Sequence, residues 1–377
     1  MRKVKLYLLF VLLITSGYLN AQKTAVYKNP DARYRDAIEL FNKEKYGAAR
    51  ELFREVINEL NDPKSVVTAD ACYYAAVCSI ELYNKDGEFE LTNFINLYPE
   101  NTKINMAWFR LGCYQFSSDK QKQAIISFEN VDIYELSDAQ KTEYNFKKGY
   151  CYFIANNNDK AKKHFGEVKD GASKYAAPAT YYYAHILYLE KNYETALIHF
   201  NKLKKDENFG AIVPYYIAQI LYMQSKYEEL LEVAPPLFKN STPKRMPELA
   251  HLIGDSYYKT GKYKEAIPYL RFYQEKTNAK ITREDNYVLG FAYYKAQICD
   301  TAIIEFHKVC TLEDSLSQNA WYHMGDCYIK TNNKKLARNA FMSAYKNGLD
   351  KKIKEDALYN FAKVSYELAI NPYNDAI

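Results

Sequence analysis

Small residues recur along the chain within a repeating apolar pattern. Gly or Ala returns every 34 to 38 residues, at Ala37, Ala75, Gly112, Gly149, Ala184, Ala218, Gly254, Gly290, Gly325 and Ala362. In most of these units a second small residue follows twelve positions later, and a large apolar residue four positions after that, as at Gly112, Ala124 and Phe128. Two helix axes approach to about 8 Å only where neither helix carries a bulky side chain. The pattern therefore predicts antiparallel helical hairpins, each of which buries its open face against the next.

The clearest units also carry aromatic residues at fixed distances from the small residue. One of them reads Trp321, Met324, Gly325, Tyr328, Ala337 and Phe341. This pattern resembles the tetratricopeptide repeat (TPR), whose signature runs W-x2-L-G-x2-Y and then A-x3-F. The resemblance covers ten consecutive units from about residue 30 onward. It implies an all-α fold, in which residues 22–377 form a right-handed α-solenoid, or superhelix, of about ten TPR helical hairpins.

Three units depart from the pattern. Gly87 stands where Ala is expected in the second unit, which predicts a looser or shifted turn between its two helices. Pro235 and Pro236 fall inside the second helix of the sixth unit and predict a kink or a break there. Tyr373 and Ala376 have the spacing of a further second helix that is just beginning. The sequence therefore predicts an array truncated within its tenth repeat, with residues beyond about 355 frayed.

The N-terminus has the three regions of a secretory signal peptide. Arg2, Lys3 and Lys5 precede an apolar run over residues 6–14, and small and polar residues follow up to Ala21. We expect cleavage after Ala21, which makes 1–21 the signal peptide. The apolar run is far shorter than the roughly 20 residues that span a bilayer, and no later stretch is long enough, so no transmembrane segment is expected after cleavage. The first cysteine is Cys72, so the lipid-attachment cysteine of bacterial lipoproteins is not expected, and the predicted location is the periplasm.

Charge argues against nucleic acid as a partner. The three basic residues of the signal peptide are not matched by acidic ones, so residues 22–377 carry 48 basic and 46 acidic side chains. A nucleic-acid binder would show a basic stripe that neutralises phosphates. The lysine-rich segments 202–205 and 351–354 instead lie at predicted hairpin ends beside acidic residues, which is typical of solvated helix ends.

Seven cysteines in an exported chain raise the question of disulfides. The count is odd, and four of the cysteines fall in first helices close to the small residue, where a small apolar side chain is wanted: Cys78, Cys113, Cys151 and Cys327. Free buried thiols are therefore the main expectation. One pair, Cys310 and Cys327, remains a candidate bridge between neighbouring helices.

No signature of catalysis or metal binding is present in the sequence. It has no H-E-x-x-H, C-x-x-C or G-x-S-x-G motif, and the segment from Gly254 to Lys262 has the wrong spacing for a phosphate loop. His164 and His199 occupy the same second-helix position one repeat apart, but two ligands do not make a metal site, so surface roles are expected for them. The chain is predicted to be non-enzymatic, with no catalytic residue, no metal and no cofactor.

Two lines of aromatic residues follow the first helices. The first aromatic line lies four residues after each small residue and is predicted to face the concave side: Phe41, Ser79, Phe116, Phe153, Tyr188, Tyr222, Tyr258, Tyr294, Ile329 and Tyr366. The second aromatic line lies three residues before each small residue: Tyr34, Cys72, Phe109, Phe146, Tyr181, Tyr215, His251, Tyr287, Tyr322 and Tyr359. Such rings are common at these positions for packing alone. They also present large apolar surfaces that anchor peptides, so the two lines predict a partner-binding groove.

The groove changes character along the chain. One residue beyond the first aromatic line come Ile154, Leu189 and Met223, and in later units Lys259, Lys295 and Lys330. Some members of the family hold the C-terminal carboxylate of a chaperone with paired Lys and Asn. This chain has Tyr181, Tyr215, His185 and Gln219 at the matching places, so that clamp is absent.

Three functions stay open at this point. The first is a non-enzymatic protein–protein interaction scaffold of the bacterial cell envelope that binds segments of envelope proteins in its groove, similar to the repeat proteins of the Tol–Pal machinery and of outer-membrane assembly. The second is a carbohydrate or peptidoglycan binder that stacks Tyr and Phe on sugar faces. The third is an enzyme subunit whose catalytic part lies elsewhere. The resemblance behind the first is at the level of the fold.

Overall fold

The computed structural model describes residues 30–240 and 242–374. The predicted signal peptide, 1–21, lies outside these residues. The described part of the chain is helical and contains no strand. It forms two compact units, Met1–Ala179 and Thr180–Ile377, whose boundary falls within helix α10 (Ala176–Leu189). The two units are described separately.

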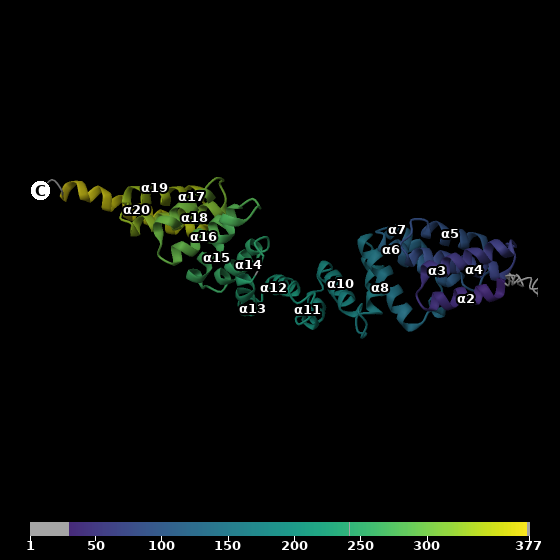
Figure 1. Cartoon of the computed structure of the whole chain (residues 1–377). Helices are drawn as coiled ribbons and strands as arrows, with labels where there is room; N and C mark the ends of the chain where they lie inside the picture. The colour runs from purple at the N-terminus through teal and green to yellow at the C-terminus, as the bar shows by residue number, and fades with distance from the viewer. Residues whose placement is uncertain (1–29, 241, 375–377) are drawn as a thin grey trace, which may run out of the picture. The chain divides into compact units, whose positions relative to one another are not determined.

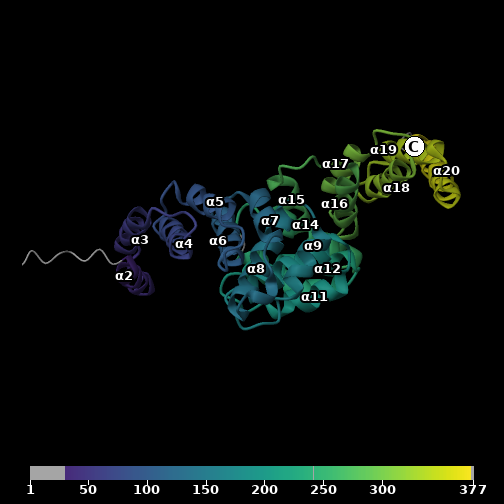
Figure 2. The same ribbon diagram turned by 90° about the vertical axis from the view of Figure 1, so that its right-hand side faces the viewer.

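The first unit contains four helical hairpins in chain order (Figures 1 and 2). A short 3-10 helix, Ile133–Glu135, precedes the fourth hairpin. The α-helices are α2 (Pro30–Asn42), α3 (Tyr46–Leu60), α4 (Val66–Glu81), α5 (Gly87–Leu97), α6 (Ile104–Ser117), α7 (Gln121–Glu129), α8 (Asp138–Ile154) and α9 (Asn158–Gly166).

The second unit continues the same alternation. It begins within α10 and contains α11 (Tyr193–Lys202), α12 (Val213–Met223), α13 (Tyr227–Lys239), α14 (Met246–Lys259), α15 (Tyr263–Lys276), α16 (Arg283–Lys295), α17 (Cys299–Val309), α18 (Ser315–Lys330), α19 (Lys334–Asn347) and α20 (Lys351–Asn374).

Within each unit, every hairpin packs on the next. From α2 to α9 and from α11 to α20 each helix contacts the next one in the chain. First helices of successive hairpins also contact one another: α2 with α4, α4 with α6 and α6 with α8, then α12 with α14, α14 with α16, α16 with α18 and α18 with α20. The first helices therefore line one side of each stack. The predicted fold class, an all-α solenoid of helical hairpins, is confirmed.

Small residues bring the two helices of a hairpin together as predicted. A Cβ atom added to Gly325 would lie 2.7 Å from the ring of Phe341, and one added to Gly112 would lie 2.7 Å from the ring of Phe128. Both rings are almost fully buried. The glycine is therefore required by the close approach of the second helix, and the aromatic ring fills the space above it.

The turn inside each hairpin has the same backbone geometry. One residue per turn has a positive φ: Glu44, Tyr83, Asp119, Asn156, Lys191, Ser225, Gly261, Gln297 and Asn332. All of them except Tyr83 lie seven positions after the small residue that the sequence pattern marks as the crossing. The next N–H bonds five residues back, as from Lys45 to the carbonyl of Leu40 at 2.9 Å. These are the features of a Schellman helix end. Gly261 is one of these turn residues, which gives the glycine of the Gly254–Lys262 segment a structural role.

These turns also correct the register of the second repeat. Tyr83 lies seven residues after Ala76, whereas the sequence pattern pointed to Ala75. Ala76 packs with Phe94 of its own second helix, while Ala75 belongs to the cluster of the preceding hairpin. The predicted shifted turn is confirmed, because α4 ends at Glu81 and α5 begins only at Gly87. Tyr73 rather than Cys72 therefore belongs to the second aromatic line; its ring centroid lies 5.4 Å from that of Phe94.

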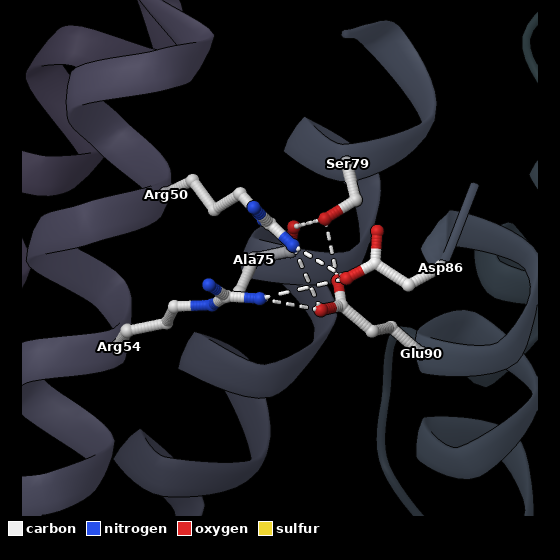
Figure 3. Close-up of polar contacts among 6 residues, drawn as sticks. All are labelled: Arg50, Arg54, Ala75, Ser79, Asp86 and Glu90. Carbon is white, nitrogen blue, oxygen red and sulfur yellow. Dashed lines mark hydrogen bonds and ion pairs between the residues drawn. The ribbon is translucent and has the colours of Figure 1, made fainter. Parts of the chain in front are cut away.

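The longer turn is followed by a carboxylate that is largely withdrawn from water. Glu90 lies in the first turn of α5, and its side chain is 22 % exposed. Figure 3 shows how it is accommodated: the hydroxyl of Ser79 donates a hydrogen bond to Glu90, and two arginines of α3 approach from the preceding hairpin. Arg50 and Arg54 lie 3.0 and 2.8 Å from the same carboxylate oxygen. Hydrogen bonds and opposite charge together offset the desolvation of Glu90.

Two further departures have different outcomes. A kink or a break was predicted at Pro235 and Pro236; helix α13 runs unbroken through both prolines, so the break is wrong. Both prolines lie near the end of the helix, and the preceding turns are anchored by the buried side chains of Leu230 and Ala234. Helix α20 is one helix up to Asn374, and Tyr373 lies within it rather than in a new helix. Packing of α20 on α19 includes the buried Val364.

Candidate partner-binding site

Polar contacts join the rings of the first aromatic line to the next first helix in the second unit. The Tyr222 hydroxyl of α12 donates a hydrogen bond to the carboxylate of Asp255 in α14, with an O···O distance of 2.7 Å. The Tyr188 hydroxyl of α10 likewise donates to the side-chain oxygen of Gln219 in α12, at 3.2 Å. In both cases the partner is the residue directly after the crossing residue. The ring and its partner therefore tie neighbouring repeats together.

The same relation continues in the later repeats of this unit. The ring of Tyr258 packs edge-on against Phe291, with centroids 5.8 Å apart. Tyr294 hydrogen-bonds Asp326 and lies with its ring centroid 4.8 Å from that of His323. The first helices α12, α14, α16 and α18 thus carry a continuous row of aromatic and polar contacts on the side where they meet.

Burial changes the acid–base behaviour of this row. It raises the pKa of Tyr258 to about 12, and burial together with the neighbouring carboxylates raises the pKa values of Tyr222 and Tyr294 well above the usual tyrosine range. Burial in low dielectric disfavours the charged phenolate. These hydroxyls therefore stay protonated at physiological pH and act as hydrogen-bond donors.

The first unit has the apolar version of this arrangement. Phe116 contacts Tyr150 of the next first helix, with centroids 5.7 Å apart, and the ammonium of Lys147 lies 5.5 Å from the Phe116 ring centre. Phe41 packs on Tyr74 in the same way, at 5.0 Å. The ring of one repeat again meets the first helix of the following repeat.

Rings of the second aromatic line turn toward the second helix of their own hairpin. Tyr287 lies 5.8 Å from Phe306, Phe146 lies 6.0 Å from Phe165, and Tyr181 lies 6.2 Å from Phe200. Phe109 is 5 % exposed and belongs to the core around Phe128. Tyr215 has the guanidinium of Arg245 at 4.7 Å over its ring. These side chains are mainly packing residues, with Phe109 withdrawn from the surface altogether.

The three lysines after the first aromatic line lie over its rings. The Nζ atom of Lys330 is 4.6 Å from the Tyr294 ring centre and 2.8 Å from a carboxylate oxygen of Asp326. Lys295 lies 5.2 Å from the centre of Phe291, and Lys259 lies 5.9 Å from that of Tyr258. At these distances the cations are attracted to the ring faces. The later part of the row is therefore a surface of rings, acids and cations in contact.

The earlier first helices leave apolar side chains in water at the equivalent place. Leu189 is 51 % exposed and Met223 is 56 % exposed in the second unit, and Ile154 is 48 % exposed in the first. Phe153 of α8, which was also predicted to line the groove, is half-buried. The position after the first aromatic line thus offers exposed apolar side chains in these three helices.

Sequence reasoning placed Asp255 and Asp326 near the groove but did not pair the rings with their partners. They lie two residues before and one residue after the crossing residue: Tyr216 and His323 at the first place, and Gln219, Asp255, Phe291 and Asp326 at the second. The residue type at these two positions differs from repeat to repeat. The sequence therefore shows no recurring residue there that would mark the positions as contacts of the rings.

A cleft opens beside His251 in the second unit. It has a volume of about 560 Å³, and its walls include Gln219 of α12, Glu248 of α14 and the end of α15 with Tyr273 and Lys276. The ring of His251 lies 4.4 Å from that of Tyr273. Charged and aromatic side chains thus surround a hollow at the edge of the first helices, which adds a polar recess to the candidate surface.

The histidines singled out in the sequence are packing residues. His164 is half-buried; its Nδ1 lies 2.8 Å from the side-chain oxygen of Asn145, and burial lowers the pKa of its ring to about 4. His199 is 8 % exposed and its ring packs on Tyr183. The expected surface roles were therefore wrong, because the helix face on which both histidines lie is covered by the first helix of the hairpin. In the part of the chain that the structure describes, no group of His, Cys, Asp or Glu is arranged to hold a metal ion.

Of the four cysteines expected in the core, three are buried and Cys113 is half-buried. All seven are free thiols, and Cys78, Cys151, Cys299 and Cys327 are buried. The candidate pair Cys310 and Cys327 is not formed. The thiol of Cys327 hydrogen-bonds that of Cys299 instead. Over the described ranges, no helix is both long and apolar enough to cross a bilayer.

Comparison with protein families finds a match to two segments of the second unit. The family model of the tetratricopeptide repeat matches residues 247–271 and 318–347, which lie in the hairpins α14–α15 and α18–α19. Proteins of this family generally mediate protein–protein interactions. No curated protein matches the chain.

Several solved structures of repeat proteins are similar to the chain. The TPR protein YrrB, described as having an unusual peptide-binding site, is 20 % identical; the match covers 48 % of this chain and 92 % of that one, with a TM-score of 0.42. A tetratricopeptide repeat protein from Parabacteroides merdae is 14 % identical over 78 % of this chain and 98 % of its own, with a TM-score of 0.39. The C-terminal part of a TPR repeat-containing protein from Cytophaga hutchinsonii is 16 % identical over 66 % and 99 %, with a TM-score of 0.44.

Proposed function

We propose that this chain is a non-enzymatic scaffold that binds segments of partner proteins along the side where its first helices meet. The observation that carries the proposal is the continuous row of rings, carboxylates and lysines across α12, α14, α16 and α18. It offers apolar area together with hydrogen-bonding groups at a regular spacing. Rings held in place lose little entropy on binding, which suits them as anchors for a peptide segment.

Specificity would come from the side chains that remain in contact with water. Leu189 and Met223 offer apolar surface, while Lys259 and Lys295 offer positive charge farther along the same unit. We expect the preferred partner segment to be apolar where it meets the first pair and acidic where it meets the second.

Export is part of the proposal. The basic, apolar and small-residue regions within 1–21 support cleavage after Ala21 and delivery to the periplasm. Partners would then be proteins of the bacterial cell envelope. Sequencing the N-terminus of the mature protein tests this step directly, with Gln22 expected as the first residue.

The contacts of the row give less support to sugar binding. Stacking on a sugar requires an open ring face, and here the lysines Lys259, Lys295 and Lys330 lie over ring faces of the first aromatic line and its partners. A glycan array with the purified protein checks this alternative.

Photo-crosslinking tests the scaffold without disturbing the packed rings. A benzophenone amino acid placed at Lys259 presents its reactive group on the row, whereas the same group at Lys264, an exposed position of the second helix α15, serves as the matched control. We expect envelope extract to give discrete protein adducts with the first variant and not with the second. Equal adduct patterns from the two positions, or none from the first, would show that this side of the molecule is not the binding surface.

A further inference from the structure

A pocket of about 180 Å³ lies between the second helices α3 and α5, with α4 as its floor. Its walls are mostly apolar: Ile57 of α3, Ala75 and Ala76 of α4, and Phe94 and Leu97 of α5. Cys72 also faces it. None of its lining residues belongs to the first aromatic line.

Cys72 holds a position that a tryptophan takes in two other repeats. It lies four residues before Ala76, the crossing residue that the hairpin turn assigns to this repeat. Trp108 and Trp321 lie four residues before the crossing glycines of the third and ninth repeats. The second repeat therefore has a thiol at the position where the third and ninth repeats have an indole. This equivalence holds only in the corrected register, with Ala76 as the crossing residue.

The residues around Cys72 and around Trp321 also lie at equivalent positions. Arg54 and Ile57 of α3 lie seventeen and twenty residues after their crossing residue, as His307 and Cys310 of α17 do after theirs. In the ninth repeat the ring of Trp321 packs against His307, with centroids 5.9 Å apart. In the second repeat the matching wall residue, Arg54, faces the pocket.

The mouth of the pocket carries charge that is already held in place. Arg54 of α3 and Glu90 of α5 meet over Ala75, with 2.8 Å between nitrogen and oxygen (Figure 3). All three residues line the pocket, as does Leu97, whose side chain is largely exposed. A guanidinium fixed by a carboxylate presents a flat cationic face, which favours an electron-rich ring beside it.

We propose that this pocket binds one uncharged aromatic group of the size of a benzene or indole ring. An apolar cavity of about 150 Å³ is sufficient to take up benzene in a protein interior. The pocket exceeds this volume, has apolar walls and has a cation at its rim. The ring can come from a free aromatic compound or from a tryptophan side chain of a partner, since both present the same surface.

Titration with indole tests the site on the whole chain. We expect one saturable site by calorimetry and a rise in melting temperature at saturating indole. The variant Cys72→Trp supplies the ring covalently; it should lose indole binding and melt at a higher temperature than the parent. Trp321→Ala is the matched control, because it opens the equivalent place in the ninth repeat and should add a second indole site.

A measurement on the unmodified protein makes the test independent of these variants. Indole should slow the alkylation of Cys72 several-fold, as followed by peptide mass spectrometry, and should leave the half-buried Cys310 unaffected. N-acetyltryptophanamide serves as the second probe. Protection by both compounds points to a side chain of a partner as the natural occupant, and protection by indole alone points to a small molecule. The absence of any saturable indole binding, or unchanged binding in Cys72→Trp, would overturn the proposal.

Discussion

The effect of a glycine-to-alanine replacement on the free energy of unfolding should depend on the space beside each glycine. At Gly325 an added Cβ would lie 2.7 to 2.9 Å from three ring carbons of Phe341. Carbon atoms normally pack about 3.5 to 4.0 Å apart, so the ring or the helix must move by nearly 1 Å. Phe341 is 2 % exposed and packs against Ala337 and Val364, which leaves the ring little room.

The expected size follows from two opposing effects. Overpacking a core typically costs about 1 to 3 kcal/mol, whereas replacing a helical glycine by alanine returns about 1 kcal/mol. Gly325→Ala should therefore lower the free energy of unfolding by about 1 kcal/mol. Gly47 has nothing within 4 Å of its added Cβ, so Gly47→Ala should raise that free energy by about 0.5 kcal/mol.

Intermediate cases complete the series. The contacts of an added Cβ at Gly290 are 3.0 to 3.2 Å, so Gly290→Ala should fall between the other two. Gly290→Leu adds further carbon atoms at the same crossing and should cost about 1 to 3 kcal/mol, while the exposed change Lys264→Ala should be nearly neutral.

Urea unfolding followed by far-ultraviolet circular dichroism measures this order, and hydrogen exchange shows whether the loss is local to α18 and α19. A Gly325→Ala variant that is as stable as Gly47→Ala would refute the assignment of the crossing. Equal shifts for Gly290→Leu and Lys264→Ala would refute it as well.

Two further predictions concern polar contacts in the second unit. Tyr222→Phe removes the hydrogen bond to the buried carboxylate of Asp255 and should lower the free energy of unfolding by about 1 to 3 kcal/mol, measured by urea unfolding against Tyr359→Phe, a control position that is 69 % exposed; equal effects of the two would contradict the role of Tyr222 between repeats. The hydrogen bonds from Arg283 hold the pKa of Asp314 well below its usual range, so this carboxylate should stabilise the fold above a pH of about 4, and that stability should be lost as the pH falls toward the lowered pKa. Asp314→Asn should flatten the melting temperature over this acid range, and an unchanged pH profile would argue against the contribution.

The spacing of small residues was sufficient to predict the hairpins. A glycine such as Gly112 and a phenylalanine such as Phe128 specify a crossing through their own volumes, wherever the hairpin lies in the chain. The hairpin turns were less visible. Of the nine turn residues with positive φ, only Gly261 is a glycine, and residues such as Lys191 or Gln297 give no sign in the sequence that they adopt this conformation. The hydrogen bonds of the helix end impose it.

Register and ring partners needed the tertiary structure. Ala75 and Ala76 are equally small neighbours, so the sequence could not show which of them faces α5; packing against Phe94 decides it. The first aromatic line was visible in the sequence, but the contact of Tyr222 with Asp255 was not, because it depends on how one repeat stacks on the next.

The sequence by itself thus determined the helices, their pairing into hairpins and the aromatic character of the first helices, because these depend on residue volume and on periodicity along a single helix. The tertiary structure decided which rings are anchored and which ring faces the lysines cover. It also decided that a pocket lies beside Cys72, at a position where two other repeats have a tryptophan. Those features depend on distances between side chains from different repeats. A repeating pattern gives equivalent positions in each unit but does not show what fills the space between them.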